Sequence, residues 1–270
     1  MLLYTSGVRL DAVARKPWTR LGAVKEPSHD PPGPPGAARR GFITTRWSLV
    51  LVAGKDAAPQ AHKALSELFE LYRSPVHAFI RSQRYPADEA EDLTQDFFAQ
   101  MLEKNYLAVL EPGRGRFRNW LLVSVKHYLA NRRDYERAEK RGGGQVRIEL
   151  EDAEVSSRES AGLTPEQSFE WHWAVRILEN ALNALGEECA RAGKGLLFSK
   201  LKKTLTGEAE DSLASIAKEL GMKTGTVRIN VFRFRRRYQE LVEQEVLHTV
   251  KDPEEVHDEL RFLKSVLKRA

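Results

Sequence analysis

The feature that most constrains this chain is an apolar stripe with helical spacing in the stretch TVRINVFRFRRRYQEL, residues 226–241. Its members follow one another at intervals of four and three residues: Val227, Val231, Phe234, Tyr238 and Leu241. This spacing puts them on one face of an α-helix, and such a face needs a buried partner. The same stretch holds five arginines and one acid. It therefore predicts a helix with one face in a core and an arginine-rich face directed elsewhere.

Similar stripes recur along most of the chain and predict an all-α fold. The expected helices cover residues 61–83, 87–104, 117–141, 165–186, 194–205, 211–220, 224–247 and 252–268. We expect Pro75 to kink or break the first of them, because proline removes a helical hydrogen bond. The last helix opens with the stretch DPEE, which predicts Asp252 as its cap. Only the segment QVRIEL has a strand-like pattern.

The residues before the arginine-rich helix, DSLASIAKELGMKTGTV, favour a helix-turn-helix. Such a motif needs a small residue where the helices cross, a glycine in the turn and an apolar anchor on the second helix. Ala217, Gly221 and Val227 supply these features. A plain helical hairpin is the alternative, but an ordinary solvated face would mix lysine with glutamate. The arginines favour a recognition helix, whose candidate DNA-binding residues are Thr226, Arg228, Ile229, Phe232, Arg233 and Arg236.

Two neighbouring helices in the first half of the chain carry opposite charge. Residues 87–103 contain six acids and no lysine or arginine, whereas residues 113–141 contain nine lysines and arginines against three acids. The two helices could pair with one another. Alternatively, the acidic helix docks a basic protein partner while the basic helix faces nucleic acid, where Trp120, Tyr128 and Tyr135 suit stacking on unpaired bases.

Composition predicts two helical domains joined by a flexible linker, the second containing the helix-turn-helix. Six of the twelve prolines fall in the first 41 residues, and three glycines followed by acids and serines interrupt the helical pattern after residue 141. The expected division is a disordered tail 1–41, a first domain 42–141, a linker 142–163, a second domain 164–248 and a helical extension 249–270.

Charge and cysteine content set further bounds. The net charge is 43 − 38 = +5, and the single cysteine, Cys189, fits a reducing compartment. Neither a membrane span nor a secretory signal is recognisable, so we expect a cytoplasmic protein. The seven histidines form no metal-binding motif, and neither a nucleophile elbow nor a P-loop occurs. The sequence therefore argues against an enzyme and predicts no cofactor and no metal.

The order of these motifs resembles the extracytoplasmic-function class of bacterial RNA polymerase sigma factors. The resemblance covers residues 43–248 and lies in EDLTQDFF, RGRFRNWLLVSVKHYLANRRD and SIAKELGMKTGTVRINVFRFRRRY. It implies a protein that directs the polymerase core to promoters and assists their melting. The implied partners are the core enzyme, through its β′ clamp and β flap, and promoter DNA, with an anti-sigma factor left open.

The resemblance also implies roles for individual residues. Contact with the core polymerase falls to Asp92, Gln95 and Asp96, with Leu93 and Phe97 as core positions. Binding of the minus-ten element falls to Lys126, His127, Asn131, Arg133 and Arg137, together with the loop arginines Arg114, Arg116 and Arg118. We assign Lys140 and Arg141, at the end of the basic helix, to phosphate contacts. The helix-turn-helix is expected to read the minus-thirty-five element.

The chain departs from the family pattern at several positions. His127 and Asn131 stand where many members have asparagine and aspartate, and Lys223 replaces a capping serine, so Thr224 is the expected cap. Because of these differences, the sequence does not predict which promoter is read. It also leaves the regulon, the inducing signal and the oligomeric state open. A conventional helix-turn-helix regulator that is not a polymerase subunit is the alternative, although it would not explain the two charged helices of the first half.

The C-terminal helix allows two interpretations. Its apolar stripe consists of Val256, Leu260, Leu263 and Leu267. The helix could pack on its own domain near Trp171 and Trp173, or it could cover the apolar part of the recognition helix and mask it.

Overall fold

The computed structural model describes residues 59–103, 116–142, 162–206 and 212–269, and within these ranges it is helical without a strand. This confirms the all-α class for the described part. The α-helices are α3 (Pro59–Ser82), α4 (Ala87–Glu103), α5 (Phe117–Gly142), α6 (Pro165–Arg191), α7 (Gly195–Thr206), α8 (Leu213–Glu219), α9 (Thr224–Leu247) and α10 (Val256–Arg269), and the 3-10 turn η3 (Pro253–Glu255) precedes the last. The expected tail 1–41, the segment QVRIEL and most of the linker 142–163 lie outside the described residues.

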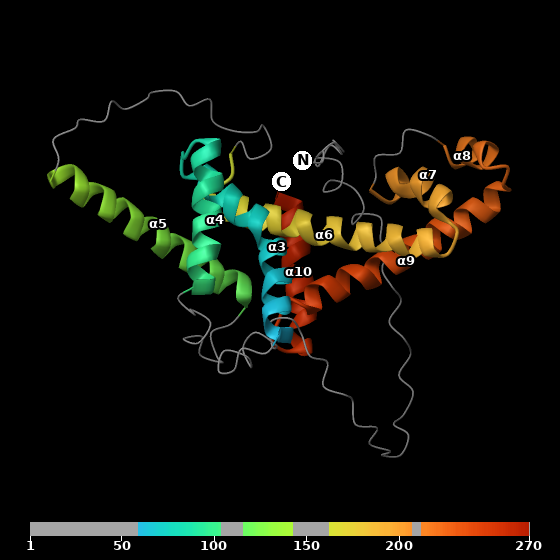
Figure 1. Ribbon diagram of the computed structural model, residues 1–270. Helices are drawn as coiled ribbons and strands as arrows, with labels where there is room; N and C mark the ends of the chain where they lie inside the picture. The colour runs from blue at the N-terminus through green and yellow to red at the C-terminus, as the bar shows by residue number, and fades with distance from the viewer. Residues whose placement is uncertain (1–58, 104–115, 143–161, 207–211, 270) are drawn as a thin grey trace, which may run out of the picture.

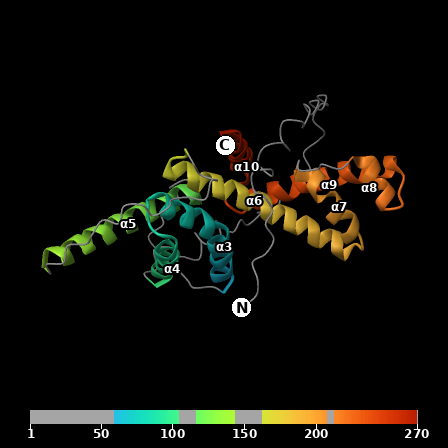
Figure 2. The same ribbon diagram turned by 90° about the horizontal axis from the view of Figure 1, so that it is seen from above.

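Helix boundaries agree with the expected ones to within five residues. α9 begins and ends at the expected residues. α3 continues through Pro75 as one helix, so the expected break is absent, while the bend of α3 along its length agrees with the expected kink (Figures 1 and 2). α6 extends to Arg191, beyond its expected end, and begins with a capping box between Thr164 and Gln167. The side chain of Asp252 makes no capping hydrogen bond, and η3 rather than an α-helical turn follows it.

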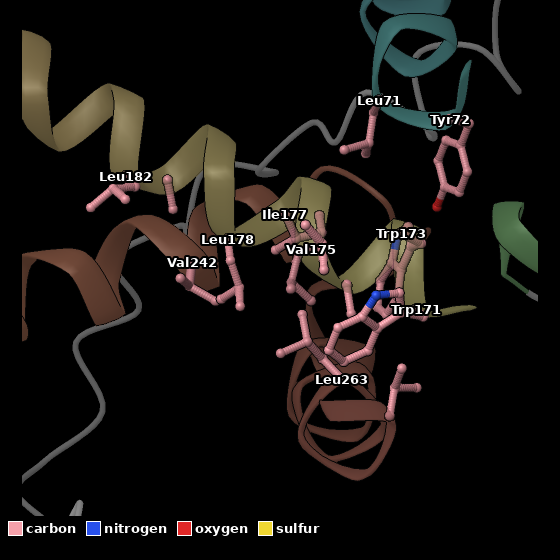
Figure 3. Close-up of a cluster of buried hydrophobic side chains, with 14 of the residues drawn as sticks. Leu71, Tyr72, Trp171, Trp173, Val175, Ile177, Leu178, Leu182, Val242 and Leu263 are labelled. Atoms are coloured by element: carbon pink, nitrogen blue, oxygen red, sulfur yellow. The ribbon is translucent and has the colours of Figure 1, made fainter. Parts of the chain in front are cut away.

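α6 is the central helix of the structure (Figures 1 and 2). α3 packs along it, α9 packs against its other part, and α10 contacts both α6 and α9. Leu71 and Tyr72 of α3, Trp173 of α6 and Leu263 of α10 belong to one continuous cluster of buried side chains (Figure 3). The two halves therefore share a core in this structure, and the expected arrangement of two domains held only by a flexible linker is not confirmed.

The two helices with candidate DNA-binding residues point to opposite ends of the molecule. α5 projects from one end, while α8 and the beginning of α9 lie at the other (Figures 1 and 2). α4 packs on α3 beside the body from which α5 projects. None of the helices in the described ranges is both long and apolar enough to cross a membrane.

α10 packs as part of the core. Leu263, Val266 and Leu267 are buried, and the ring of Phe262 lies 6.0 Å from that of Trp173. Ile229 and Phe232 remain 53% and 68% exposed. The first interpretation of α10 is therefore confirmed, and the alternative, that it covers the apolar part of the recognition helix, is contradicted.

Candidate nucleic-acid and protein-binding surfaces

Residues 212–247 fold into a short helix, a tight turn and a long helix. Ser212 caps α8 by accepting a hydrogen bond from the Ser215 backbone N–H at 3.1 Å. Gly221 in the turn has φ +62°, a conformation that glycine adopts without strain. Ala217 and Val227 are buried where α8 meets α9. The three positions singled out in the sequence thus hold α8 against the start of α9. The first residue of α9 is Thr224, and neither it nor Lys223 provides a side-chain cap, contrary to the expectation for Thr224.

The arginine-rich face of α9 is exposed at its N-terminal end. All six candidates on this helix, Thr226, Arg228, Ile229, Phe232, Arg233 and Arg236, are exposed. Arg236 lies 3.4 Å from Glu240 in an ion pair within the helix. The Asn230 side chain donates to the Thr226 carbonyl at 2.9 Å. The result is an exposed surface of arginines interspersed with two large apolar side chains.

Two arginines further along α9 serve the fold instead. Arg237 donates to both carboxylate oxygens of Glu188 on α6, at 2.8 and 2.7 Å, and to Glu240 at 2.9 Å. The hydrogen bonds from Arg237 hold the pKa of Glu188 below its ordinary value. Arg235 donates to the Thr204 carbonyl of α7 at 3.3 Å. These arginines fix α9 against its neighbours, in keeping with their absence from the candidate DNA-binding set.

The acidic helix α4 presents part of its predicted partner-binding set. Asp92 and Gln95 are exposed, and Gln95 donates to Glu91 at 2.9 Å. Asp96 is half-buried and accepts hydrogen bonds from the Tyr128 hydroxyl at 2.6 Å and from Gln100 at 3.0 Å. Burial and this carboxylate raise the pKa of the Tyr128 hydroxyl. Asp96 therefore joins α4 to α5, whereas Asp92 faces solvent.

The core positions expected on α4 are confirmed, since Leu93 and Phe97 are both buried.

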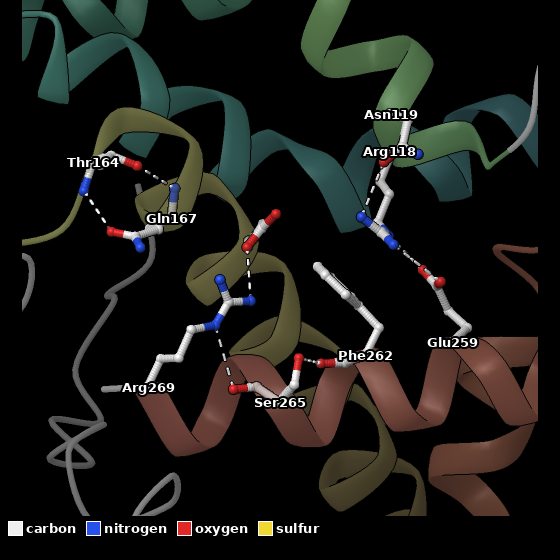
Figure 4. A network of polar contacts seen from close by, with 9 residues as sticks. Arg118, Asn119, Thr164, Gln167, Glu259, Phe262, Ser265 and Arg269 are labelled. Carbon is white, nitrogen blue, oxygen red and sulfur yellow. Dashed lines mark hydrogen bonds and ion pairs between the residues drawn. The ribbon is translucent and has the colours of Figure 1, made fainter.

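The first turn of α5 does not match its predicted role. Arg118 is only 6% exposed and binds both oxygens of Glu259 on α10, at 2.6 and 3.3 Å (Figure 4). Its guanidinium lies 3.7 Å from the ring centroid of Phe262. Arg116 forms an ion pair with the same carboxylate at 2.9 Å. Arg118 is thus a buried packing residue in this structure, which corrects the DNA-binding role that the family resemblance implies for it.

The middle of α5 carries the other predicted minus-ten residues. His127 and Asn131 are exposed. Lys126 forms an ion pair with Glu166 of α6 at 2.7 Å, with both side chains partly exposed. The Arg133 guanidinium donates a hydrogen bond to the Tyr85 hydroxyl at 3.2 Å.

Further along α5, Arg137 is exposed and pairs with Asp134 at 3.7 Å. Arg114 and the side chains of Lys140 and Arg141 lie outside the described residues.

Of the aromatic residues expected to stack on bases, only Tyr135 is largely exposed. Trp120 packs on Phe117, with ring centroids 5.6 Å apart, and Tyr128 packs on Phe97 at 5.4 Å. The interleaving of aromatics with arginines in the sequence therefore reflects core packing at two of the three positions.

The charged helices α4 and α5 do not neutralise one another through the ion pairs that are described. Glu91 of α4 pairs with Arg73 of α3, while Lys126 of α5 pairs with an acid of α6, and Arg116, directly before α5, pairs with an acid of α10. The described ion pairs thus do not support the alternative of mutual pairing, and the described hydrogen bond between the two helices is the one from Tyr128 to Asp96.

Sequence reasoning missed the acids that complete these contacts, Glu259 above all. Glu259 is 1% exposed and lies on the same face of α10 as Leu263 and Val266. A signal existed, because residues at i, i+4 and i+7 share a helix face. Local sequence does not distinguish a buried acid from a solvated one, however.

Comparison with protein-family models, with curated proteins and with solved structures gives no match for this chain.

Proposed function

We propose that this chain is an RNA polymerase sigma factor of the extracytoplasmic-function class, which directs the core enzyme to promoters and assists their melting. The observation that carries the proposal is the exposed N-terminal face of α9, where Arg228, Arg233 and Arg236 flank Ile229 and Phe232. Arginine binds phosphates and the edge of guanine, and apolar side chains contact thymine methyl groups. With α8 and the turn at Gly221, this face forms the proposed helix-turn-helix for the minus-thirty-five element.

The first half of the chain supplies the functions that set a sigma factor apart from an ordinary regulator. We assign Asp92 and Gln95 of α4 to the β′ clamp of the core enzyme, because both are exposed on a helix without basic residues. His127, Asn131 and Arg137 of α5, with Tyr135 beside them, are assigned to the minus-ten strand, where an aromatic side chain can stack on an unpaired base.

Run-off transcription with purified core polymerase tests the proposal. The template is fragmented genomic DNA from the source organism, and transcripts are mapped at their starts. We expect specific transcripts only when the chain and the core enzyme are both present, and we expect Asp92→Asn to reduce them by lowering core binding. Glu187→Gln, an exposed acid of α6, is the matched control and should leave the transcripts unchanged.

The same experiment separates the alternative, a conventional helix-turn-helix regulator built on α8 and α9. Such a protein binds its duplex tightly without polymerase and does not retain the core enzyme in a pull-down. Sequence-specific duplex binding by the pure chain, combined with no effect of Asp92→Asn on core association, would reject the sigma factor assignment.

A further inference from the structure

Acidic side chains of α6 and α10 form ion pairs with three bases in the N-terminal half of α5 and directly before it. Glu259 of α10 binds Arg116 at 2.9 Å and Arg118 at 2.6 Å, and Glu166 of α6 binds Lys126 at 2.7 Å (Figure 4 shows the Arg118–Glu259 contact). All three bases belong to the set that the sequence assigns to DNA. Each of these bases is therefore paired with a carboxylate of the chain itself.

The contact with Glu259 is built into the core and is unlike a surface ion pair. Arg118 and Glu259 are separated by 141 residues and are both buried. The guanidinium carbon lies 3.7 Å from the ring centroid of Phe262 and 5.5 Å from that of Trp173. The same carboxylate raises the pKa of the buried Tyr72 hydroxyl, after the larger effect of burial itself. A buried charge without its partner is strongly unfavourable. Removing either Arg118 or Glu259 alone should therefore destabilise the contact between α5 and α10.

A second contact places α10 along α6. Arg269 donates to Glu170 at 3.0 Å and to the Ser265 carbonyl at 3.4 Å (Figure 4). α10 thus touches α6 and α9 with its apolar face and reaches α5 with one carboxylate. It is the element that joins the end of the chain to the start of the minus-ten helix.

We infer that α10 is an autoinhibitory clasp: Glu259 holds α5 closed against the second half and neutralises Arg116 and Arg118 until nucleic acid or the polymerase separates them. The inference rests on the proposed function for the role of α5 in DNA binding, but its structural part does not. When Glu259 moves away, phosphates of the DNA strand would bind Arg116 and Arg118 in its place. Separation of α5 from α10 and binding of the strand would therefore be coupled, because both depend on the same two arginines.

The distance between the two halves tests the clasp without polymerase. Fluorophores are attached to Ala130→Cys on α5 and Ala214→Cys on α8, both exposed, in a Cys189→Ala background. We expect one narrow distance distribution for the parent chain. Glu259→Gln leaves two arginines without a charged partner, so the ratio of open to closed molecules should rise on the order of 100-fold. Asp258→Asn, one residue away in an exposed ion pair with Arg261, is the matched control and should not change the distribution.

A second variant tests whether the charge pair is the clasp. Arg118→Met with Glu259→Leu replaces the buried ion pair by apolar groups, and such replacements keep or raise stability. We expect this chain to stay closed. An unchanged distance distribution in Glu259→Gln overturns the inference. Loss of helical circular dichroism in Glu259→Gln also overturns it. In that case the ion pair would be required for folding of the whole chain and would not merely join two folded parts.

Binding of a short single-stranded oligo(dT), followed by fluorescence anisotropy, tests the masking. For Glu259→Gln the slope of log K against log salt should steepen by about 1.4, because each phosphate contact with a single strand contributes about 0.7. Opening without this change refutes the masking of α5. A chain that opens and binds as expected, yet supports no run-off transcription, rejects the proposed function and leaves the clasp in place.

Discussion

Replacing Arg233 and Arg237 of α9 separately by alanine tests whether this helix divides into a DNA-reading part and a structural part. The two residues are one helical turn apart and of the same type, so each is the other's control. Arg233 is exposed on the face that carries Ile229 and Phe232. Arg237 instead binds Glu188 and Glu240 through three hydrogen bonds.

The magnitudes follow from these surroundings. Arg237 is 36% exposed, so its ion pairs are partly screened and are together worth about 1 kcal/mol of unfolding free energy. For a chain of this size that corresponds to a fall in Tm of about 2–4 °C. Arg233→Ala, at an exposed position, should change the unfolding free energy by less than about 0.5 kcal/mol. It should instead weaken specific promoter binding by about 1–3 kcal/mol, or roughly 5- to 150-fold.

The assay combines thermal unfolding with promoter binding by the holoenzyme at several salt concentrations. If Arg233 contacts a phosphate, its loss lowers the salt slope by about 0.9 and weakens all promoters alike. If it reads a guanine, the loss is largest for promoters that carry that base. Equal losses of binding from both variants, or a larger fall in Tm for Arg233→Ala, would refute the division of α9.

Three further predictions concern other parts of the chain. Asp92→Asn should reduce retention of core polymerase in a pull-down at unchanged Tm, whereas Asp96→Asn should also lower stability by about 1 kcal/mol, because Asp96 accepts from Tyr128. Burial raises the folded-state pKa of the Tyr128 and Tyr238 hydroxyls above their unfolded value of about 10. Their contribution to the free energy of unfolding is therefore constant below pH about 10 and falls as the pH rises above it, so unfolding free energies that do not decline between pH 8 and 12 would contradict this. Gly221→Ala should cost about 1–2 kcal/mol through its positive φ alone, since an added Cβ meets no atom within 4 Å; an unchanged unfolding midpoint would exclude strain in the turn.

Local periodicity accounts for most of what sequence predicted correctly. α9 was located to the residue because its apolar stripe, the glycine before it and its polar face all indicate the same helix. At Pro75 the sequence left a kink and a break open, and no break occurs because packing on both sides holds the helix together: Tyr72 and Val76 around it are fully buried.

Long-range contacts account for what sequence did not predict. The extent of the shared core depends on α3 packing along α6, and a hydrophobic stripe does not name its partner. Of the expected stripe of α10, Leu263 and Leu267 are buried while Val256 and Leu260 are partly buried against the core, and the sequence did not predict the burial of Glu259 beside them. The Glu259 carboxylate can be buried there because Arg118, 141 residues earlier in the chain, binds it. A local sequence pattern cannot predict a contact between residues so far apart.

The arginines of α5 and α9 follow one common rule once these contacts are known. On each helix, the bases nearest the centre of the molecule are bound by carboxylates of the chain itself: Arg118 by Glu259 and Arg237 by Glu188. The bases toward the ends of the molecule, such as Arg137 and Arg233, are exposed, and the acid that Arg137 pairs with, Asp134, is exposed as well. A modest net charge of +5 is thereby compatible with two concentrated basic surfaces at opposite ends (Figure 1). A ligand that contacts both surfaces at once has to be long, strongly anionic and in register with both helices, and DNA meets these requirements.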